Sequence, residues 1–317
     1  MFQVRRGKKH GKIWRKKCFR VILFICIFPP AVYITFPERV LPSQPGGKCD
    51  KGDFMQNPAA NGTQQNSNGK TYPAFLREEH VIRAHECGEN HLLKFHVLLD
   101  YLQDIAATHA ELLDVGLSAL TEHGILWVLS RLKLEIFRYP ACDEKITLLT
   151  YPSGVNTLFA TREYYMADEK GEPLVKGTSF WLVIDGKSHR PVKASAVLPP
   201  GMPINEEKDR FFPELGKIAR RTVVPDLPFT VRHGDIDMNC HLNNALFARN
   251  VLDCLCSKKG KNLAARTIQL NFVGAGALGE TLCFGSEILE DGSFYSEAVS
   301  PDGKKLYIQA EGTLFPF

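Results

Sequence analysis

A weak internal duplication constrains the fold of this chain more than any other feature of its sequence. Residues 81–93 align with residues 230–242 at a constant offset of 149, which places Asn90 over Asn239 and Leu93 over Leu242. The same order of matches continues at smaller offsets in two further pairs of segments, 142–146 with 278–282 and 170–174 with 302–306. Two copies of one unit with connecting loops of different length would produce this pattern, so we expect a fold built from two similar halves.

Each copy predicts one long amphipathic helix followed by antiparallel strands. Apolar residues recur at three- and four-residue spacing, in the first copy at Leu98, Tyr101, Leu102, Ile105, His109, Leu112 and Leu113, and in the second at Phe247, Val251, Cys254 and Leu255. Runs typical of strands follow at 126–137, 146–151, 160–166, 175–184, 294–299 and 306–314. A helix with one apolar stripe needs a sheet to cover it. We therefore expect an α+β protein in which two antiparallel sheets each wrap around a long central helix, the helices beginning near residues 95 and 243.

A short polar motif precedes the second helix. Asp237, Asn239 and His241 stand at alternate positions, and in an extended segment their side chains would project to the same side. A carboxylate, a carboxamide and an imidazole at a helix start can bind a carbonyl, orient water and move a proton. The alternative is a loop whose Asp and Asn only cap the helix. Gly88 and Leu92 occupy two of these positions in the first copy, so only the second copy carries the whole motif.

Several segments together resemble one protein family, the fatty acyl-ACP thioesterases of plants and bacteria. They are Tyr101–His109, Gly124–Arg131, Leu134–Pro140, Ser179–Asp185 and Asp235–Asn244, and they follow the family's order between about residue 75 and residue 317. The resemblance implies a tandem, or double, hotdog fold. It also implies hydrolysis of a long-chain fatty acyl thioester, carried on ACP or on CoA, to a free fatty acid, without a metal or a cofactor.

The resemblance also assigns catalytic residues. Asp237, Asn239 and His241 fall on the family's Asp-x-Asn-x-His catalytic stretch. Thioester hydrolysis needs a water molecule deprotonated as it attacks, and a histidine side chain ordinarily has a pKa near neutrality. We therefore expect His241 to act as the general base, Asn239 to orient the water or hold the thioester, and Asp237 to orient the imidazole.

Three further residues are predicted to contact the substrate: Trp127, Asn243 and Asn244. The two asparagines follow the catalytic stretch directly, at the start of the second helix. Trp127 lies in an apolar run, where packing in the core is the alternative reading.

The chain departs from the family at one position. The relatives carry a further acidic residue in the next core strand, followed by cysteine; here those positions fall at Ala275 and Gly276. Glu280 lies nearby but is expected to be a turn residue, and His233 or Asp235 could substitute for the acid in principle. If that acid serves as base or nucleophile, this protein is slow, works differently or has lost catalysis. The alternative to the thioesterase is therefore an acyl-binding protein without turnover. A hotdog dehydratase is a third alternative, but we find no dehydratase-type histidine motif.

The N-terminus predicts attachment to a membrane. Residues 1–20 hold nine Lys and Arg and no acid, and residues 21–37 form an uncharged run of 17 residues, the lower limit for a membrane-spanning helix. A single-pass N-terminal anchor in an endomembrane is the favoured interpretation, with a cleaved peptide for a mitochondrion or plastid as the alternative. The remaining chain has a net charge of −5, which argues against a nucleic-acid partner.

The predicted organisation places a tether poor in apolar residues at 38–74, since such a segment cannot bury enough surface to fold. An N-terminal hotdog follows at 75–186, a connector at 187–221 and a C-terminal hotdog at 222–317. The nine cysteines lack CxxC spacing, so the sequence predicts no zinc site. Association into a homodimer is left open.

Overall fold

The computed structural model describes residues 63–65, 69–205, 210–260 and 262–315. The internal contacts of the chain divide it into Met1–Gln44 and Pro45–Phe317, and every described residue belongs to the second part. The basic segment predicted at 1–20 and the anchor predicted at 21–37 therefore lie outside the described residues.

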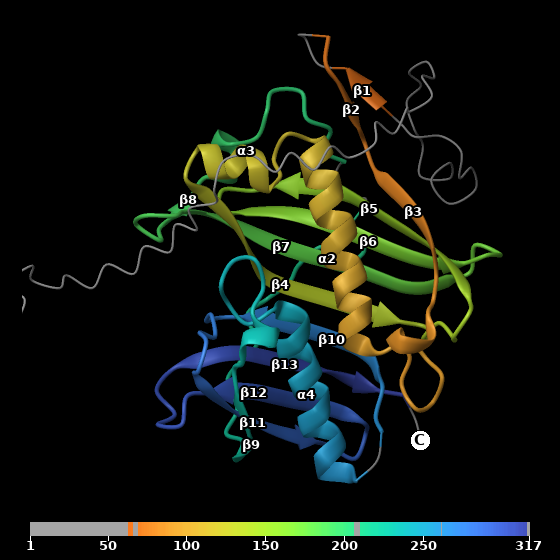
Figure 1. Ribbon diagram of the computed structural model, residues 1–317, viewed down its shortest axis with the longest axis vertical. Helices are drawn as coiled ribbons and strands as arrows, with labels where there is room; N and C mark the ends of the chain where they lie inside the picture. Colours follow the sequence, from red (N-terminus) through yellow and green to blue (C-terminus); the bar gives the residue numbers. More distant parts are fainter. Residues whose placement is uncertain (1–62, 66–68, 206–209, 261, 316–317) are drawn as a thin grey trace, which may run out of the picture. The chain divides into compact units, whose positions relative to one another are not determined.

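One continuous antiparallel sheet of eleven strands forms the centre of the fold (Figure 1). Its order is β3-β5-β6-β7-β4-β10-β13-β12-β11-β9, with the short strand β8 paired to β7. The strands are β3 (Leu76–Val81), β4 (Ile125–Ile136), β5 (Lys145–Val155), β6 (Phe159–Asp168), β7 (Pro173–Asp185), β8 (Pro191–Val192), β9 (Pro225–Thr230), β10 (Ala265–Phe272), β11 (Thr281–Ile288), β12 (Ser293–Val299) and β13 (Leu306–Leu314).

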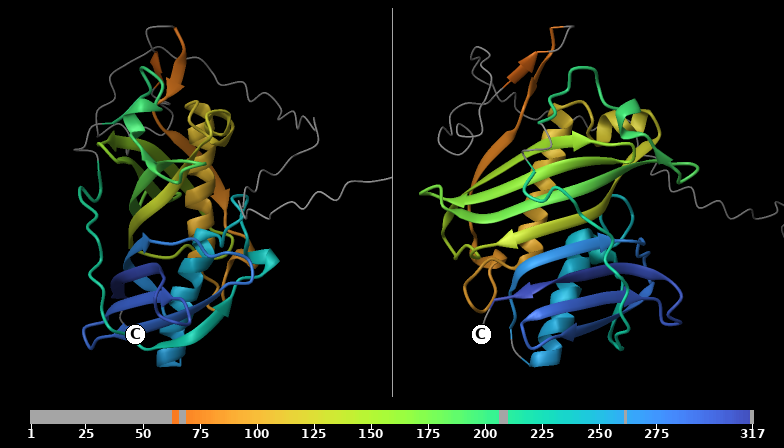
Figure 2. Two further views of the ribbon diagram at one scale, coloured as in Figure 1. Left: turned by 90° about the vertical axis from the view of Figure 1, so that its left-hand side faces the viewer. Right: turned by 180° about the vertical axis from the view of Figure 1, so that it is seen from behind.

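Two long helices, α2 (Phe95–Leu112) and α4 (Asn244–Lys259), pack on the same face of the sheet (Figures 1 and 2). They begin where the apolar periodicity predicted. Leu98 and Ile105 of α2 and Val251 of α4 are completely buried, and one continuous apolar core joins both helices to the strands. The shorter helices are η1 (Ala84–Glu86), α3 (Leu117–Glu122), η2 (Ala194–Ala196) and η4 (His233–Asp235).

The two halves join through β4 and β10. Their register pairs Leu132 with Leu270 and Leu134 with Ile268, and all four side chains are buried. We expected two sheets joined side by side, and the pairing of β4 with β10 makes them one continuous sheet. Without this pairing, β4 and β10 would each be an edge strand with unpaired backbone N–H and C=O groups.

The internal duplication reappears in the backbone hydrogen bonds of the loops that precede α2 and α4. Both loops repeat the same three bonds. In the first loop, the N–H groups of Gly88, Leu93 and Lys94 donate to the carbonyls of Leu92 (2.9 Å), Pro140 (2.9 Å) and Glu86 (3.0 Å). In the second loop, the N–H groups of Asp237, Leu242 and Asn243 donate to the carbonyls of His241 (2.8 Å), Gly276 (2.9 Å) and Asp235 (3.0 Å). The two loops therefore share one backbone conformation and differ in their side chains.

The connector between the halves crosses the face of the sheet opposite to the helices (Figure 2, left). The backbone N–H of Phe211 donates to a carboxylate oxygen of Glu163 at 2.9 Å, and Arg220 pairs with Glu297 at 3.2 Å. Glu163 on β6 and Glu297 on β12 are both buried. Polar side chains buried on a sheet need partners, so the connector stabilises both halves by supplying them.

Part of the predicted tether is ordered. Strands β1 (Thr63–Gln65) and β2 (Thr71–Pro73) pair with each other. The Tyr72 side chain is buried, and its hydroxyl donates to Asp114 at 3.0 Å, which fixes this end of the segment. Among the described residues, none of the helices is long and apolar enough to cross a membrane.

Candidate active site

The motif before α4 forms a tight turn and not the extended segment that we expected. The carbonyl of Asp237 accepts the Cys240 N–H at 3.0 Å, and Cys240 adopts a positive φ of 62°. The carboxylate of Asp237 accepts the backbone N–H groups of Asn239 (2.8 Å) and His241 (3.3 Å). Such bonds from a short acidic side chain to its own backbone compete with extended structure. The expectation that alternate residues share one face was therefore wrong.

The turn brings the side chains of Asp237 and Asn239 together and ties the His241 backbone to Asp237. The Asn239 amide donates to the second oxygen of Asp237 at 3.4 Å. Asp237 is half-buried, whereas Asn239 and His241 are exposed. Asp237 thus orders the turn through its backbone, and the His241 ring makes no hydrogen bond within the described parts of the chain. The ring is accessible to water, as a general base must be.

The two asparagines after the motif have different positions. Asn243 is the N-cap of α4, because its side-chain oxygen accepts the Ala245 N–H at 2.8 Å. The same oxygen accepts the side-chain amide of Gln103 from α2 at 3.4 Å. Asn244 instead lines a cavity between the two helices and the sheet. The capping alternative therefore holds for Asn243, and the substrate-contact prediction is kept for Asn244.

The cap gives a test of local stability. We expect Asn243→Ala to lower the free energy of unfolding by about 1 kcal/mol, since it removes the bond to the first turn of α4. Lys94 is the N-cap of α2 and makes no side-chain cap bond, so Lys94→Ala is the matched control. Urea unfolding of both variants measures the difference. Equal losses would show that the Asn243 cap contributes nothing specific.

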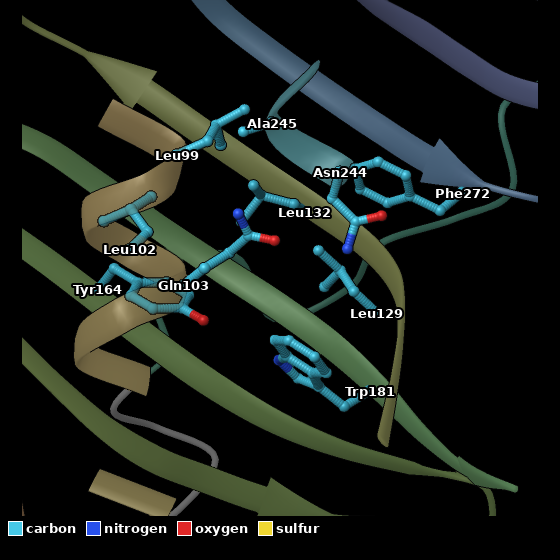
Figure 3. Close-up of a pocket in the computed structure, with 10 residues that line it drawn as sticks. All are labelled: Leu99, Leu102, Gln103, Leu129, Leu132, Tyr164, Trp181, Asn244, Ala245 and Phe272. Atoms are coloured by element: carbon cyan, nitrogen blue, oxygen red, sulfur yellow. The ribbon is translucent and has the colours of Figure 1, made fainter. Parts of the chain in front are cut away.

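The cavity beside Asn244 is narrow and mostly apolar (Figure 3). Its volume is only about 10 Å³, close to the space that a single water molecule needs. The amides of Gln103 and Asn244 point into it, between aromatic and aliphatic side chains. The lining residues are Leu99, Leu102, Gln103, Leu129, Leu132, Tyr164, Trp181, Asn244, Ala245 and Phe272. The lining is apolar enough to contact an aliphatic chain, although the cavity in this structure has room for no more than one water molecule.

Trp127 lies away from this cavity. Its indole N–H donates to the Val115 carbonyl at 2.8 Å, and its ring packs beside Ile125 and Val183. The tryptophan that lines the cavity is Trp181 of β7. We did not single it out from the sequence, although the alternation of β7 places it on the helix-facing side together with Ser179, to which its indole N–H donates at 2.7 Å.

The position of the missing family acid lies beside the turn. Gly276 accepts the Leu242 N–H at 2.9 Å, so residues 275–276 run next to the end of the motif. Ala275 is exposed there. A Cβ atom added to Gly276 would lie 3.2 Å from Leu242 Cβ, so the cysteine expected at this place in the family would crowd the first turn of α4.

The acidic residues near the site are occupied elsewhere. Glu280 accepts the Ala277 N–H at 2.8 Å and the Lys305 ammonium at 2.9 Å, which agrees with a turn residue. The Asp235 side chain accepts the Arg232 N–H at 2.8 Å, closing the capping box of η4. Neither contact directs a carboxylate towards His241.

A buried polar pair lies further along α2. The guanidinium of Arg162 donates to His109 Nδ1 at 3.0 Å and to Thr150 at 3.2 Å. Burial and the neighbouring Arg162 lower the pKa of His109 to about 3. His109 is therefore neutral at physiological pH, and its ring can accept this hydrogen bond.

Comparison with solved structures supports the fold. The protein is similar to an acyl-ACP thioesterase from Bacteroides thetaiotaomicron, with a TM-score of 0.69 and 22% identity over 76% of this chain and 98% of that one. It is also similar to the 12:0-ACP thioesterase from Umbellularia californica, with a TM-score of 0.64 and 16% identity over 78% of this chain and 99% of that one. The α+β double-hotdog fold predicted from the sequence is confirmed.

Among curated proteins, the chain is similar to oleoyl-acyl carrier protein thioesterase 1 of Arabidopsis thaliana, at 23% identity over 65% of this chain. The match covers 62% of that relative and 58% of the corresponding enzyme of Coriandrum sativum, so the chain spans about three-fifths of their length. Both relatives are named as chloroplastic.

These names contradict the predicted localisation. We expected a single-pass anchor at residues 21–37 in an endomembrane. That expectation was wrong, because the relatives are named as chloroplastic enzymes. Within the described ranges, moreover, no helix that could cross a membrane was found. The interpretation failed because a basic head followed by an apolar run is also typical of targeting segments.

Two family models match consecutive parts of the chain in the expected order. The acyl-ACP thioesterase N-terminal domain matches residues 73–197, and the acyl-ACP thioesterase C-terminal domain matches residues 219–299. Together they cover more than half of the sequence, including the cavity, the connector's ends and the polar turn. This chain therefore belongs to the acyl-ACP thioesterase family.

Proposed function

We propose that the protein hydrolyses a fatty acyl thioester, carried on acyl carrier protein, to the free fatty acid. The observation that carries the proposal is the position of Asn244, which lines the apolar cavity three residues after His241. An acyl chain held between α2 and the sheet would bring its thioester to the polar turn. The names of the relatives, all acyl carrier protein thioesterases or hydrolases, support the same substrate class.

In the proposed mechanism, His241 takes a proton from water as the oxygen attacks the thioester carbonyl. The carbon–sulfur bond then breaks, and the proton passes to the leaving thiolate. Asn239 is exposed beside His241 and would hold the water or the carbonyl oxygen through its amide. Asp237 has a positioning role, because its carboxylate accepts the backbone N–H groups of both other residues.

An assay with purified protein tests the proposal. Dodecanoyl, palmitoyl and oleoyl thioesters, each on acyl carrier protein and on CoA, would be compared for release of free thiol. We propose a preference for long chains on the carrier protein. Absence of turnover with all six substrates would contradict the proposed activity.

One observation favours a second function, the binding of acyl thioesters without turnover. Ala275 is exposed next to the turn, where the resemblance to the family places an acid. Without that carboxylate, His241 would have to activate the water without help from an acidic side chain at position 275. Tight binding of an acyl thioester that is not hydrolysed would support this alternative.

Restoring the acid distinguishes a weakened enzyme from an acyl-binding protein. We expect Ala275→Glu to raise kcat by about ten- to a hundredfold, since a positioned acid–base group contributes about 10²–10⁴-fold in enzymes. Ala277→Glu adds the same charge two residues away, at another exposed position, and serves as the control. Steady-state hydrolysis of palmitoyl-ACP measures the effect. Equal rates for both variants and the native protein would show that the acid position is not part of the site.

A further inference from the structure

A second cavity lies between the first-copy loop and helix α4. Its volume is about 310 Å³, at the lower end of the roughly 300–1,000 Å³ of small-molecule sites. Loop residues 88–96 form one wall, α4 forms the other through Arg249, Leu252, Asp253 and Cys256, and residues 262–264 close one end. This space is far larger than the cavity beside Asn244.

The internal duplication relates this cavity to the candidate active site. The loops have the same backbone hydrogen bonds, and Asn90 corresponds to Asn239. Gly88 and Leu92, however, stand where the other copy has Asp237 and His241. The first-copy cavity therefore has the loop backbone of the candidate site without its base, so a ligand bound there would not be hydrolysed by such a histidine.

The charge of this cavity also differs from that of its counterpart. Arg249 of α4 occupies the position that Asp100 occupies on α2. Its Nε atom lies 4.0 Å from the nearest oxygen of Asp253, at the limit of an ion pair, and its side chain is 33% exposed. Lys94 also lines the cavity, and its ammonium donates to a backbone carbonyl, that of His85, at 3.0 Å. Two cations, Arg249 and Lys94, and one carboxylate, Asp253, therefore line the cavity.

The histidine in the wall responds to this charge. Burial, then Arg249 and then Lys94, lower the pKa of His96 to about 4. At physiological pH the ring is neutral, so it adds no third charge and can accept or donate a hydrogen bond. The wall also contains apolar residues, among them Leu93, Phe95 and Leu263, and the asparagines Asn90 and Asn262.

We propose that this cavity binds a fatty carboxylate of medium chain length. The carboxylate would pair with Arg249 and Lys94, and the aliphatic chain would lie on the apolar wall. An arginine and a lysine beside aliphatic and aromatic side chains match an amphipathic anion in both charge and surface. This binding site is separate from the proposed thioesterase activity. Its occupancy can be measured without any turnover of a thioester, so the two proposals are tested independently.

Cys256 reports occupancy directly, because it lies in the cavity wall and is partly exposed. The full-length protein would be alkylated with N-ethylmaleimide, with and without decanoate, and the peptides quantified by mass spectrometry. At about ten times its Kd, decanoate should slow alkylation of Cys256 about tenfold, since only the free fraction reacts. Cys283 on β11, outside the cavity, is the internal control. Equal alkylation of Cys256 with and without decanoate would overturn the proposal.

Two substitutions and one neutral probe test recognition of the anion. Arg249→Gln and Lys94→Gln should each weaken protection of Cys256 by decanoate at least about fivefold, judged by the concentration required. Arg266→Gln makes the same change at an exposed position elsewhere and should leave protection unchanged. Decanol should protect poorly. Two results would contradict the carboxylate site: decanol protecting Cys256 as well as decanoate does, or both cavity variants being protected as well as the native protein. A loss of thioesterase activity alone would not contradict it.

Discussion

Replacing His241 with alanine is expected to lower kcat for palmitoyl-ACP by about two to four orders of magnitude, the usual contribution of a positioned general base. The ring is exposed at the end of the turn, and within the described ranges it makes no hydrogen bond that would indicate a structural role. The substitution should therefore leave the melting temperature nearly unchanged. Initial rates and thermal unfolding of the same preparation measure both quantities.

The duplication provides the matched controls for this experiment. Asn239→Ala should also reduce turnover, because its amide lies on the same turn as His241 and is held by Asp237. Asn90→Ala makes the equivalent change in the first-copy loop, where Gly88 and Leu92 replace the other two residues, and should have little effect on kcat. A similar loss in the Asn90 and Asn239 variants would point to the shared backbone of the loops and not to a single catalytic turn.

Replacing Glu163 with glutamine is expected to change how stability depends on pH. Burial raises the pKa of Glu163 to about 7, although Ser153, Thr178 and the Phe211 N–H all donate to its carboxylate. Its folded pKa lies above the unfolded value near 4.5, so the neutral form is favoured on folding. The stabilisation is complete below about pH 4.5 and is lost as the pH rises through about 7.

At roughly 1.4 kcal/mol per pKa unit, this loss amounts to about 2–3 kcal/mol between pH 5 and pH 8. Glu163→Gln keeps a neutral side chain at every pH, so its advantage over the native protein should grow across that range. Urea unfolding at four pH values measures the difference.

His109 has the opposite dependence, since its depressed pKa costs stability as the pH falls below about 6.5, but both proteins contain it and its effect cancels. Glu169→Gln, on an exposed turn, should follow the native curve; if it matches Glu163→Gln, burial of Glu163 is not the cause.

Much of the fold could be predicted because its elements are periodic. The stripe containing Leu98 and Ile105 predicted α2, and the alternating run at 175–184 predicted β7. The joining of β4 to β10 could not be predicted, since a strand pattern indicates which face is buried but not which strand lies at its edge. The segment at 38–74 shows a different limit. Its composition predicted a tether, but Tyr72 near its end is buried and part of the segment is ordered.

The candidate site was predicted less completely. The residue types of the polar turn could be recognised from the sequence. The turn itself could not, because the Asp237 side chain accepts backbone N–H groups and bends the chain, whereas the prediction assumed an extended strand. Trp127 and Trp181 both lie in strands. Only the pairing register shows that Trp181 lies opposite Leu129 of the cavity wall, whereas Trp127 lies opposite Val183, away from the cavity. The similarity to known thioesterases identified the family without determining either position.

The pairing of β4 with β10 leaves β3 and β9 as the outermost strands of the sheet. Neither is a good template for a strand of another molecule. Strand β3 reads Leu-Arg-Glu-Glu-His-Val, with three consecutive charged residues, and β9 contains Pro225 and Pro228, which have no N–H to donate. A second copy of this chain could not extend the sheet in register at either end without burying charge or losing hydrogen bonds. The charged sequence of β3 and the prolines of β9 thus protect the two ends of the sheet from open-ended aggregation.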